Sequence, residues 1–322
     1  MNSLPKLSND MRRLLVCPRC KSELSANESS CHCTNRDCAK TFPVVGGIPV
    51  LINEENSVFT LDEFTKRLDT YFDTSSGKQS REIISKFLPE ISANIKGKEN
   101  YRKFAELLLA NNATPRLLVL GGGIIGSGMA SLLDHPAIEF VETDIAFGPR
   151  TTLICDAHDI PFPPGTFDGV IAQAVLEHVV DPYRCVDEIH RVLKEDGLVY
   201  AETPFMQQVH GYQYDFTRFT HLGHRRLFRR FEEPESGAVC GPGMALAWSY
   251  QYFFLSFTAS KTARRLIHLF TRLTAFFWKY FDYFLINKSG TLDAASGYYF
   301  LGRKNNRVLA DRDLILLYRG AL

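Results

Sequence analysis

Four cysteines near the start of the chain have the residue type and spacing of a metal site. They form two pairs separated by a short polar stretch, Cys17 with Cys20 and Cys33 with Cys38. Thiolates paired in this way are typical of a tetrahedral zinc site. The second pair is spaced more widely than a usual knuckle. Two neighbouring side chains therefore remain alternative ligands, Cys31 and His32.

The opening residues bear on the chemistry of these thiols. The stretch MNSLPKLSNDMRRLL lacks the apolar core of a secretory signal. Cysteines of a protein that is not exported are expected to bind metal rather than to form disulfides. The sequence therefore predicts a cytoplasmic protein with a structural zinc ion.

A glycine-rich stretch follows an apolar run in the middle of the chain. The run Leu117–Leu120 reads as a buried parallel strand, and it leads directly into glycines that permit a tight turn. A helix is expected to begin near Ile125 and to point its amide groups at a ligand. Three glycines fit G-x-G-x-x-G, namely Gly121, Gly123 and Gly126. This pattern alone suits NAD, FAD or S-adenosylmethionine.

Carboxylates follow the next two expected strands. The strand 138–144 ends at Asp144, where a carboxylate can accept the ribose hydroxyls of a nucleoside cofactor. A third strand, 152–155, is followed by Asp156, which could accept the adenine amino group, and by Ala157, whose amide could reach a ring nitrogen. The alternative for Asp144 is a solvated acid at the end of a strand.

Ionisable groups follow the fourth and fifth strands. Two histidines, His178 and His210, are candidates for a general base, because imidazole titrates near neutral pH. In the aromatic segment 205–231, Asp215 and Arg218 could orient polar groups of an acceptor. For His178 the alternative is simple packing after the fourth strand.

Apolar runs that alternate with a helical pattern must position these side chains. Strands are expected at 167–174 and 198–203, with a helix at 185–193 between them. The stretch 296–304 returns to a strand pattern and is expected to be the last strand of the sheet. Such alternation is typical of an α/β protein with a doubly wound sheet.

Residues 115–235 resemble the class I S-adenosylmethionine-dependent methyltransferases, particularly the type 11 group. The matching pieces are GGGIIG, Asp144, CDAHDIPFP, FDGVIAQAVLEHV and EIHRVLKEDGLVYAETP. The resemblance implies S-adenosylmethionine at the carboxyl edge of the strands and decides against a dehydrogenase. It implies that the methionine part lies along Gly121 and Gly123, and that Gln173 lies beside the cofactor at the end of the fourth strand.

Residues 11–53 resemble a Trm112-like zinc ribbon. The resemblance rests on the start CPRC and on the end FPVVGGIPVL, where the two glycines join apolar strands into a hairpin. It implies a small β domain that has a structural or partner-binding role and carries out no chemistry itself.

Together these patterns predict a mostly parallel seven-stranded sheet with a small zinc-ribbon β domain and a C-terminal helical insertion. We expect the ribbon at 11–53, a helical connector at 54–115 and a methyltransferase domain at 116–304. The helical insertion is expected within that domain at about 244–288, and a tail follows at 305–322.

Charge and composition limit the partners. The formal net charge is +1, so no overall field recruits nucleic acid. The aromatic stretch 245–286 carries basic residues. It fits either a helical cap on the domain or helices that lie in a membrane interface.

The favoured function is methyl transfer to a small molecule or glycan, with a sugar or natural-product hydroxyl as the acceptor. Two other functions remain open. One is a non-catalytic partner-binding protein, favoured by Val119 where the resembled family usually has an acid. The other is methylation of tRNA or protein, suggested by the ribbon.

Overall fold

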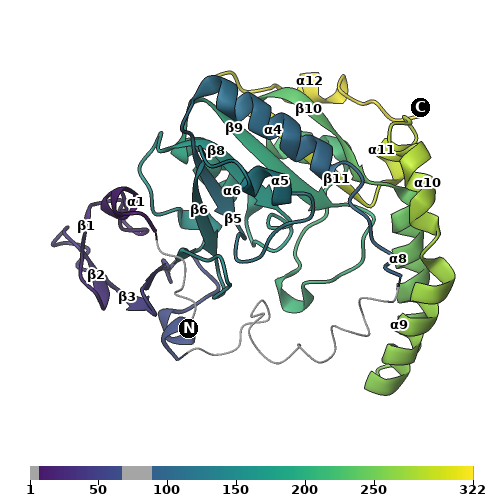
Figure 1. Cartoon of the computed structure of the whole chain (residues 1–322), viewed down its shortest axis with the longest axis horizontal. Helices are drawn as coiled ribbons and strands as arrows, with labels where there is room; N and C mark the ends of the chain where they lie inside the picture. The colour runs from purple at the N-terminus through teal and green to yellow at the C-terminus, as the bar shows by residue number, and fades with distance from the viewer. Residues whose placement is uncertain (1–6, 67–88, 322) are drawn as a thin grey trace.

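The computed structural model describes residues 7–66 and 89–321 as an α/β protein built on one large sheet (Figure 1). The described strands form an eleven-stranded sheet in the order β1-β2-β3-β4-β7-β6-β5-β8-β9-β11-β10. The strand order reverses between β5 and β8, as in a doubly wound sheet. The predicted α/β class is therefore confirmed.

Five parallel strands form the centre of the sheet. They are β5 (Arg116–Leu120), β6 (Glu139–Asp144), β7 (Leu153–Cys155), β8 (Phe167–Gln173) and β9 (Leu193–Pro204). Apolar residues occupy consecutive positions because helices or loops cover both faces. Along β5, Leu117 and Val119 pack into one core, whereas Leu118 and Leu120 pack into the other.

The first core lies under α4 (Gly97–Asn111) and α5 (Ala130–Leu133), and the second lies under α6 (Pro182–Val192) and α7 (His221–Leu227). Figure 1 shows α4 and α5 together in front of the sheet. The loops between strands and helices therefore meet at the edges of the sheet, where ligands bind in such folds.

The sheet ends in an antiparallel pair at one edge. The last strand, β11 (Gly297–Lys304), inserts between β9 and β10 (Phe231–Cys240) and runs antiparallel to both. Short helices complete the description: α1 (Asn9–Arg13), α2 (Leu61–Thr65), α12 (Asp311–Ile315) and the 3₁₀ turns η1 (Ala157–Asp159) and η2 (Tyr212–Tyr214).

The N-terminal strands extend the same sheet at its other edge. They are β1 (Leu24–Ala26), β2 (Ser30–Cys33), β3 (Thr41–Val45) and β4 (Ile48–Leu51). The last of them, β4, pairs in parallel with β7, with Val50 opposite Ile154. The prediction of a mostly parallel seven-stranded sheet is therefore wrong. The reason is that β7 leaves an open backbone edge, and the cysteine-bearing segment, residues 17–56, covers it with β4.

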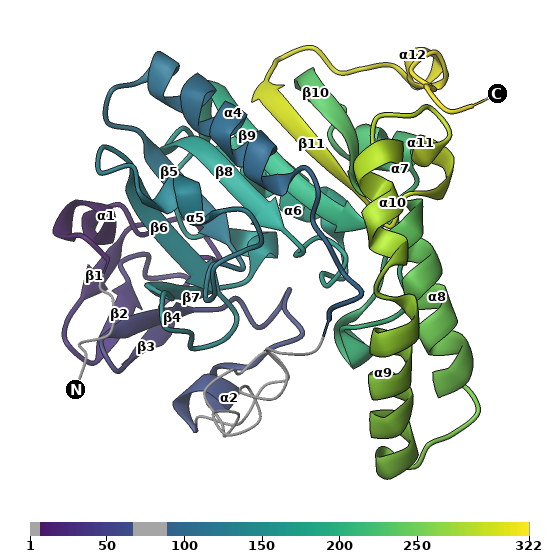
Figure 2. The ribbon, with the colours of Figure 1, turned by 45° about the vertical axis from the view of Figure 1, so that its right-hand side comes forward.

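Four helices lie between β10 and β11. They are α8 (Pro242–Leu255), α9 (Lys261–Ala275), α10 (Trp278–Leu285) and α11 (Thr291–Ala294). Figure 2 shows α8 and α9 side by side, projecting beyond the end of the sheet. Among the described residues, no helix is both long and apolar enough to cross a bilayer. Residues 67–88 of the predicted connector lie outside the described part of the chain.

Candidate functional site

A cavity of about 530 Å³ opens at the carboxyl ends of the central strands. This is the edge of a doubly wound sheet where ligands bind, close to the reversal of strand order. The structure brings all seven predicted cofactor residues to its wall: Gly121, Gly123, Gly126, Asp144, Asp156, Ala157 and Gln173. His178 and His210 also line the cavity.

The glycine loop after β5 is a series of turns and not the start of a helix. The predicted helix from Ile125 is wrong, because α5 begins only at Ala130 and has four residues. Two glycines explain this. Gly121 has φ of +67°, and Gly128 has φ of +87° with the backbone of Gly97 too close to admit a side chain. Such a loop presents its backbone to the cavity without the dipole of a long helix.

Asp144 holds this loop against the end of β6. Its Oδ2 accepts a hydrogen bond from the Gly123 amide at 2.9 Å, and its Oδ1 accepts from the Ile145 and Ala146 amides. Burial raises the pKa of Asp144, although these amides oppose the shift. The side chain therefore both shapes the glycine loop and lines the cavity.

Asp156 is buried at the end of β7 and is held from two sides. Its Oδ1 accepts from the backbone amide of His158 at 3.0 Å and from the ring Nδ1 at 2.6 Å, and its Oδ2 accepts from the Ser57 hydroxyl at 2.5 Å. Burial disfavours the charge of Asp156, but the His158 and Ser57 contacts bring its pKa below the usual range. Ser57 directly follows the cysteine-bearing segment in the chain. Its hydrogen bond to Asp156 therefore connects the end of that segment to the cavity wall.

Gln173 is the centre of a polar network behind the glycine loop. Its Nε2 donates to the Ser127 carbonyl at 3.0 Å and to Glu202 at 2.8 Å, and its Oε1 accepts from the Tyr101 hydroxyl at 3.0 Å. A Cβ at Gly126 would overlap the Gln173 amide oxygen. Glycine at this position therefore leaves room for the network.

Glu202 belongs to this network and was not predicted from the sequence. Its carboxylate accepts from the Tyr200 hydroxyl at 2.5 Å and from the Asn94 amide at 2.9 Å. Burial raises its pKa to about 7. An acidic residue directly after the apolar run Leu198–Ala201 was the available signal, since such a group needs partners.

His178 and His210 lie together with Glu177 on one wall of the cavity. The two rings are 5.1 Å apart between centroids, and the Nε2 of each lies 3.8 Å from Glu177 Oε1. The two histidines come from separate loops, after β8 and after β9 respectively. Both histidines are candidates from the sequence, whereas Glu177 was not among the predicted residues and joins them only in the structure.

Asp215 and Arg218 are not part of the cavity wall. Asp215 accepts from the His210 and Gly211 amides at 2.8 and 3.1 Å and is paired with Arg218. Burial opposes this charge, but Arg218 and the amides hold the pKa of Asp215 well below its usual range. Arg218 also donates to the Gln207 and Gln208 carbonyls. The pair therefore holds the loop that carries His210.

The four predicted cysteines converge at the N-terminal edge of the sheet, where β2 ends at Cys33. Their sulfur atoms all lie within 4.8 Å of one another. The Cys17 and Cys38 sulfurs are 3.8 Å apart, and those of Cys20 and Cys33 are 3.4 Å apart. Tetrahedral zinc–sulfur bonds of about 2.3 Å require a separation of about 3.8 Å. The thiol positions therefore fit zinc.

The two alternative ligands lie outside this cluster. Cys31 is buried in the core under α6, and His32 is held on β2 by hydrogen bonds to the Ser30 and Thr41 hydroxyls at 2.8 and 3.0 Å. The four sulfurs therefore form the group without either of them.

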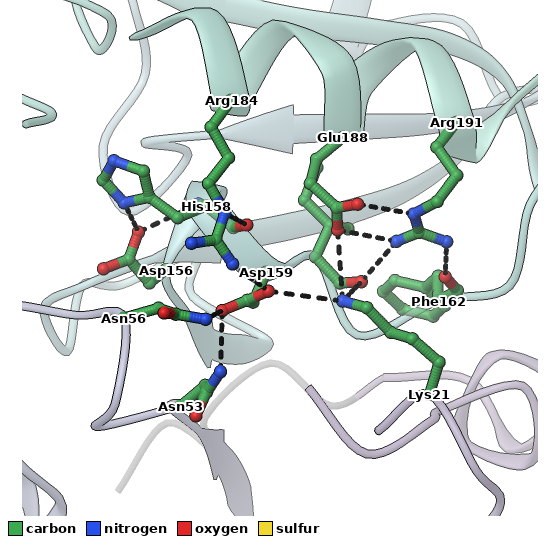
Figure 3. Close-up of polar contacts among 11 residues, drawn as sticks. Lys21, Asn53, Asn56, Asp156, His158, Asp159, Phe162, Arg184, Glu188 and Arg191 are labelled. Carbon is green, nitrogen blue, oxygen red and sulfur yellow. Dashed lines mark hydrogen bonds and ion pairs between the residues drawn. The ribbon is translucent and has the colours of Figure 1, made fainter. Parts of the chain in front are cut away.

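A polar junction joins the cysteine-bearing segment to the sheet (Figure 3). Asp159 is at its centre and accepts hydrogen bonds from Asn53 at 2.9 Å, Asn56 at 3.2 Å and Arg184 at 2.7 Å. Beside it, Lys21 donates to Glu188 at 3.2 Å. These contacts join the N-terminal segment to η1 and α6, directly behind Asp156.

Comparison with known proteins gives one family match. Residues 129–201 match the family model described as "Methyltransferase domain". The matched stretch runs through β6, β7, β8, α6 and most of β9. It includes four predicted cofactor residues, Asp144, Asp156, Ala157 and Gln173, but not the glycine loop.

The curated relatives are similar over a short stretch. "Arginine-hydroxylase NDUFAF5, mitochondrial" of Rattus norvegicus is 37% identical over 67 residues, which are 21% of this chain and 19% of that protein. The protein of the same name from Mus musculus is 36% identical over the same shares. The chain therefore spans about a fifth of the length of the curated relatives it matches.

Solved structures are similar only distantly. One is Burkholderia thailandensis 1,6-didemethyltoxoflavin-N1-methyltransferase, with 14% identity, coverage of 84% of this chain and 98% of that chain, and a TM-score of 0.40. Another is Haemonchus contortus phosphoethanolamine N-methyltransferase 2, with 16% identity, coverage of 63% and 53%, and a TM-score of 0.39.

Proposed function

We propose that this chain is an S-adenosylmethionine-dependent methyltransferase whose acceptor carries a hydroxyl group. The observation that carries the proposal is one cavity whose wall holds every residue predicted to bind the cofactor. The match of residues 129–201 to a methyltransferase family supports it. A small molecule or glycan remains the proposed acceptor class.

The residues around the cavity fit the cofactor. Asp144 would hold the ribose hydroxyls, and Asp156 with the Ala157 amide would hold the adenine. Gly121 and Gly123 line the cavity where the methionine part would lie, and Gln173 supports the loop from behind. When bound, S-adenosylmethionine supplies a methyl group on a positively charged sulfur.

The protein's contribution to the reaction is positioning and proton transfer. Holding an acceptor oxygen in line with the methyl group reduces the barrier mainly through proximity. The acceptor must also lose a proton, and the histidine pair lies on the cavity wall where an acceptor would enter. The Asp215–Arg218 pair would act indirectly by holding the His210 loop in place.

Calorimetric titration with S-adenosylmethionine tests the proposal. A hydrogen bond to a charged group contributes about 1.5–3 kcal/mol, so Asp144→Ala and Asp156→Ala should each weaken binding about ten- to a hundredfold. Asp187→Ala, which removes an exposed carboxylate on α6, is the matched control and should bind normally. Failure of the wild-type protein to bind the cofactor would instead favour the non-catalytic partner-binding protein.

We also propose that the four cysteines hold one structural zinc ion. Their sulfur separations support this, and so does the burial of Cys17 and Cys33. Zinc there would stabilise the hairpin that carries β4, which is paired to the sheet edge. The ion would have no part in the transfer reaction, because the cluster lies away from the cavity wall.

A further inference from the structure

Glu177 is a buried acid that faces two histidine rings on the cavity wall. The residue is 1% exposed, and neither carboxylate oxygen has a hydrogen bond of normal length among the described residues. Its nearest cationic candidates are the two histidine rings, at 3.8 Å. An ionised carboxylate in such a place costs several kcal/mol unless a positive charge lies against it. A positive charge in the cavity next to Glu177 would therefore stabilise this carboxylate.

The two histidines turn the same ring atom towards this carboxylate. His178 Nδ1 lies 2.7 Å from the Tyr214 carbonyl, and His210 Nδ1 lies 3.1 Å from the Gln208 carbonyl. A carbonyl oxygen only accepts, so each contact requires a proton on Nδ1, and at His210 the Arg218 Nη2 group lies near the same atom at 3.4 Å. Each Nε2 then faces Glu177. In metal sites, a backbone carbonyl commonly accepts from the ring nitrogen that does not bind the metal and so orients the histidine.

We infer that Glu177, His178 and His210 bind a divalent transition-metal ion in the cavity. One ligand atom from each residue lies within 4.8 Å of the other two. Bonds of about 2.1 Å need ligand separations of about 3.0–3.4 Å. The observed 3.8 Å contacts would close by about half an ångström around an ion. Two imidazoles and one carboxylate on one side of an ion leave positions open for other ligands.

Through its open positions the ion could bind and activate the methyl acceptor. This role rests on the proposed methyltransferase function. All three residues line the cavity, so an acceptor with two neighbouring oxygen atoms, such as a vicinal diol, could bind the ion. With both histidines as ligands, the ion would replace a histidine base: it would lower the pKa of the bound hydroxyl, whose proton would pass to water. The oxygen–carbon bond then forms as the carbon–sulfur bond breaks, and the sulfur keeps the electron pair.

Cobalt(II) titration of the full chain, purified with its zinc, tests this site. We expect one cobalt ion per chain, with weak visible bands typical of nitrogen and oxygen ligands. A thiolate-to-cobalt charge-transfer band would instead report displacement at the cysteines. Glu177→Gln and His210→Gln should each weaken cobalt binding at least a hundredfold, whereas His135→Gln, an exposed histidine, should not.

The outcomes separate the metal site from the proposed function. Absence of cobalt binding in the wild type, or equal binding by Glu177→Gln, would overturn the site. Titration with S-adenosylmethionine is run in parallel, because its failure would overturn the methyltransferase proposal alone. Circular dichroism confirms that each variant is folded. A second metal-ligand variant, His178→Gln, replaces any variant that is not.

A second inference rests on the surface of α9 and α10. Large apolar side chains at helical spacing form one exposed stripe: Leu266, Phe270, Leu273, Phe277, Phe281 and Phe284. All are at least 41% exposed, and two are above 60%. An apolar surface of this extent on a monomer marks an interaction site.

The charges beside the stripe have one sign. The segment 261–288 has six basic residues: Lys261, Arg264, Arg265, Arg272, Lys279 and Lys288. Its one acid, Asp282, is fully buried and accepts from the Gly243 and Met244 amides. Three of the basic residues, Lys261, Arg265 and Lys288, are exposed, so the charge of the exposed face is positive.

We propose that this face, the α9–α10 face, docks on the surface of an anionic lipid bilayer. A helix with apolar and basic residues and no exposed acid is suited to lying in the headgroup region. Packing links the face to the cavity. Tyr252 of α8 donates to the Val209 carbonyl at 2.8 Å, and Gln208 donates to Ser249 at 3.1 Å. Docking would thus bring α8, which contacts the loop that carries His210, towards the membrane.

Sedimentation with vesicles tests this surface. The chain should bind vesicles of phosphatidylcholine mixed with phosphatidylglycerol, and high salt should release it. Phe281→Ser with Phe284→Ser should reduce the bound fraction at least tenfold. A matched double variant on α12, Ile315→Ser with Leu316→Ser, removes equally exposed apolar side chains and should bind normally.

Two results would overturn the membrane inference. One is equal binding to vesicles of phosphatidylcholine alone, because the basic residues would then have no role. The other is a stable dimer in sedimentation velocity that the Phe281/Phe284 double variant converts to monomer, because a second copy would then cover the face.

Discussion

Replacing Asp159 by alanine should loosen the junction between the cysteine-bearing segment and the sheet. The wild-type carboxylate, nearly buried, accepts from Asn53, Asn56 and Arg184 at 2.7–3.2 Å. Hydrogen bonds to charged groups contribute about 1.5–3 kcal/mol each, and exposure of Arg184 reduces the value of that contact. We expect a net loss of about 3 kcal/mol in the free energy of unfolding.

Urea unfolding followed by circular dichroism measures this loss. With a slope of about 3 kcal/mol per M, the midpoint should fall by about 1 M. Hydrogen exchange adds a local readout, because the amides of β4 should lose protection before those of β5. The control is Asp187→Ala on α6, which breaks an exposed ion pair to Arg230 at 3.2 Å. It should cost less than about 1 kcal/mol.

Equal midpoints for Asp159→Ala and Asp187→Ala would refute this reasoning. They would mean that the pairing of β4 with β7 holds the N-terminal segment without the polar junction. A large loss without a change in β4 protection would place the effect within α6 and η1 instead.

Three further predictions concern the site and the metal. Gly126→Ala should weaken S-adenosylmethionine binding at least tenfold, because the new Cβ would overlap Gln173. Adding Gln173→Ala should recover part of the lost affinity, and calorimetry measures both variants. Cys20→Ser should remove one zinc per chain in elemental analysis, and Ser22→Ala, beside it, should retain it. Burial raises the pKa of Glu202 to about 7 from 4.5, so the folded state keeps a proton that the unfolded state releases. The stability that Glu202 contributes is therefore present below about pH 4.5 and is lost by about pH 7, a fall of up to about 3 kcal/mol. Unfolding at several pH values should show this fall, and Glu202→Gln should flatten it; an unchanged slope would contradict the assignment.

The sequence alone determined the strands of the centre and the residues at their ends. Continuous apolar runs such as Leu117–Leu120 report burial on both faces, and local pattern suffices to show this. In a parallel sheet, strand ends meet at one edge. The positions of Asp144, Asp156 and Gln173 on one cavity wall followed from their places in the chain. The cysteine spacing likewise indicated which four thiols meet.

Only the tertiary structure decided how these parts join. The pairing of β4 with β7 depends on backbone groups at an open edge, which side-chain patterns do not reveal. The glycine loop lacks the predicted helix because Gly128 lies against the backbone of α4, a contact distant in sequence. His210 meets Glu177 because the Asp215–Arg218 pair bends its loop. Convergence of polar side chains depends on such loop conformations, whereas periodicity reports only which face of an element is buried.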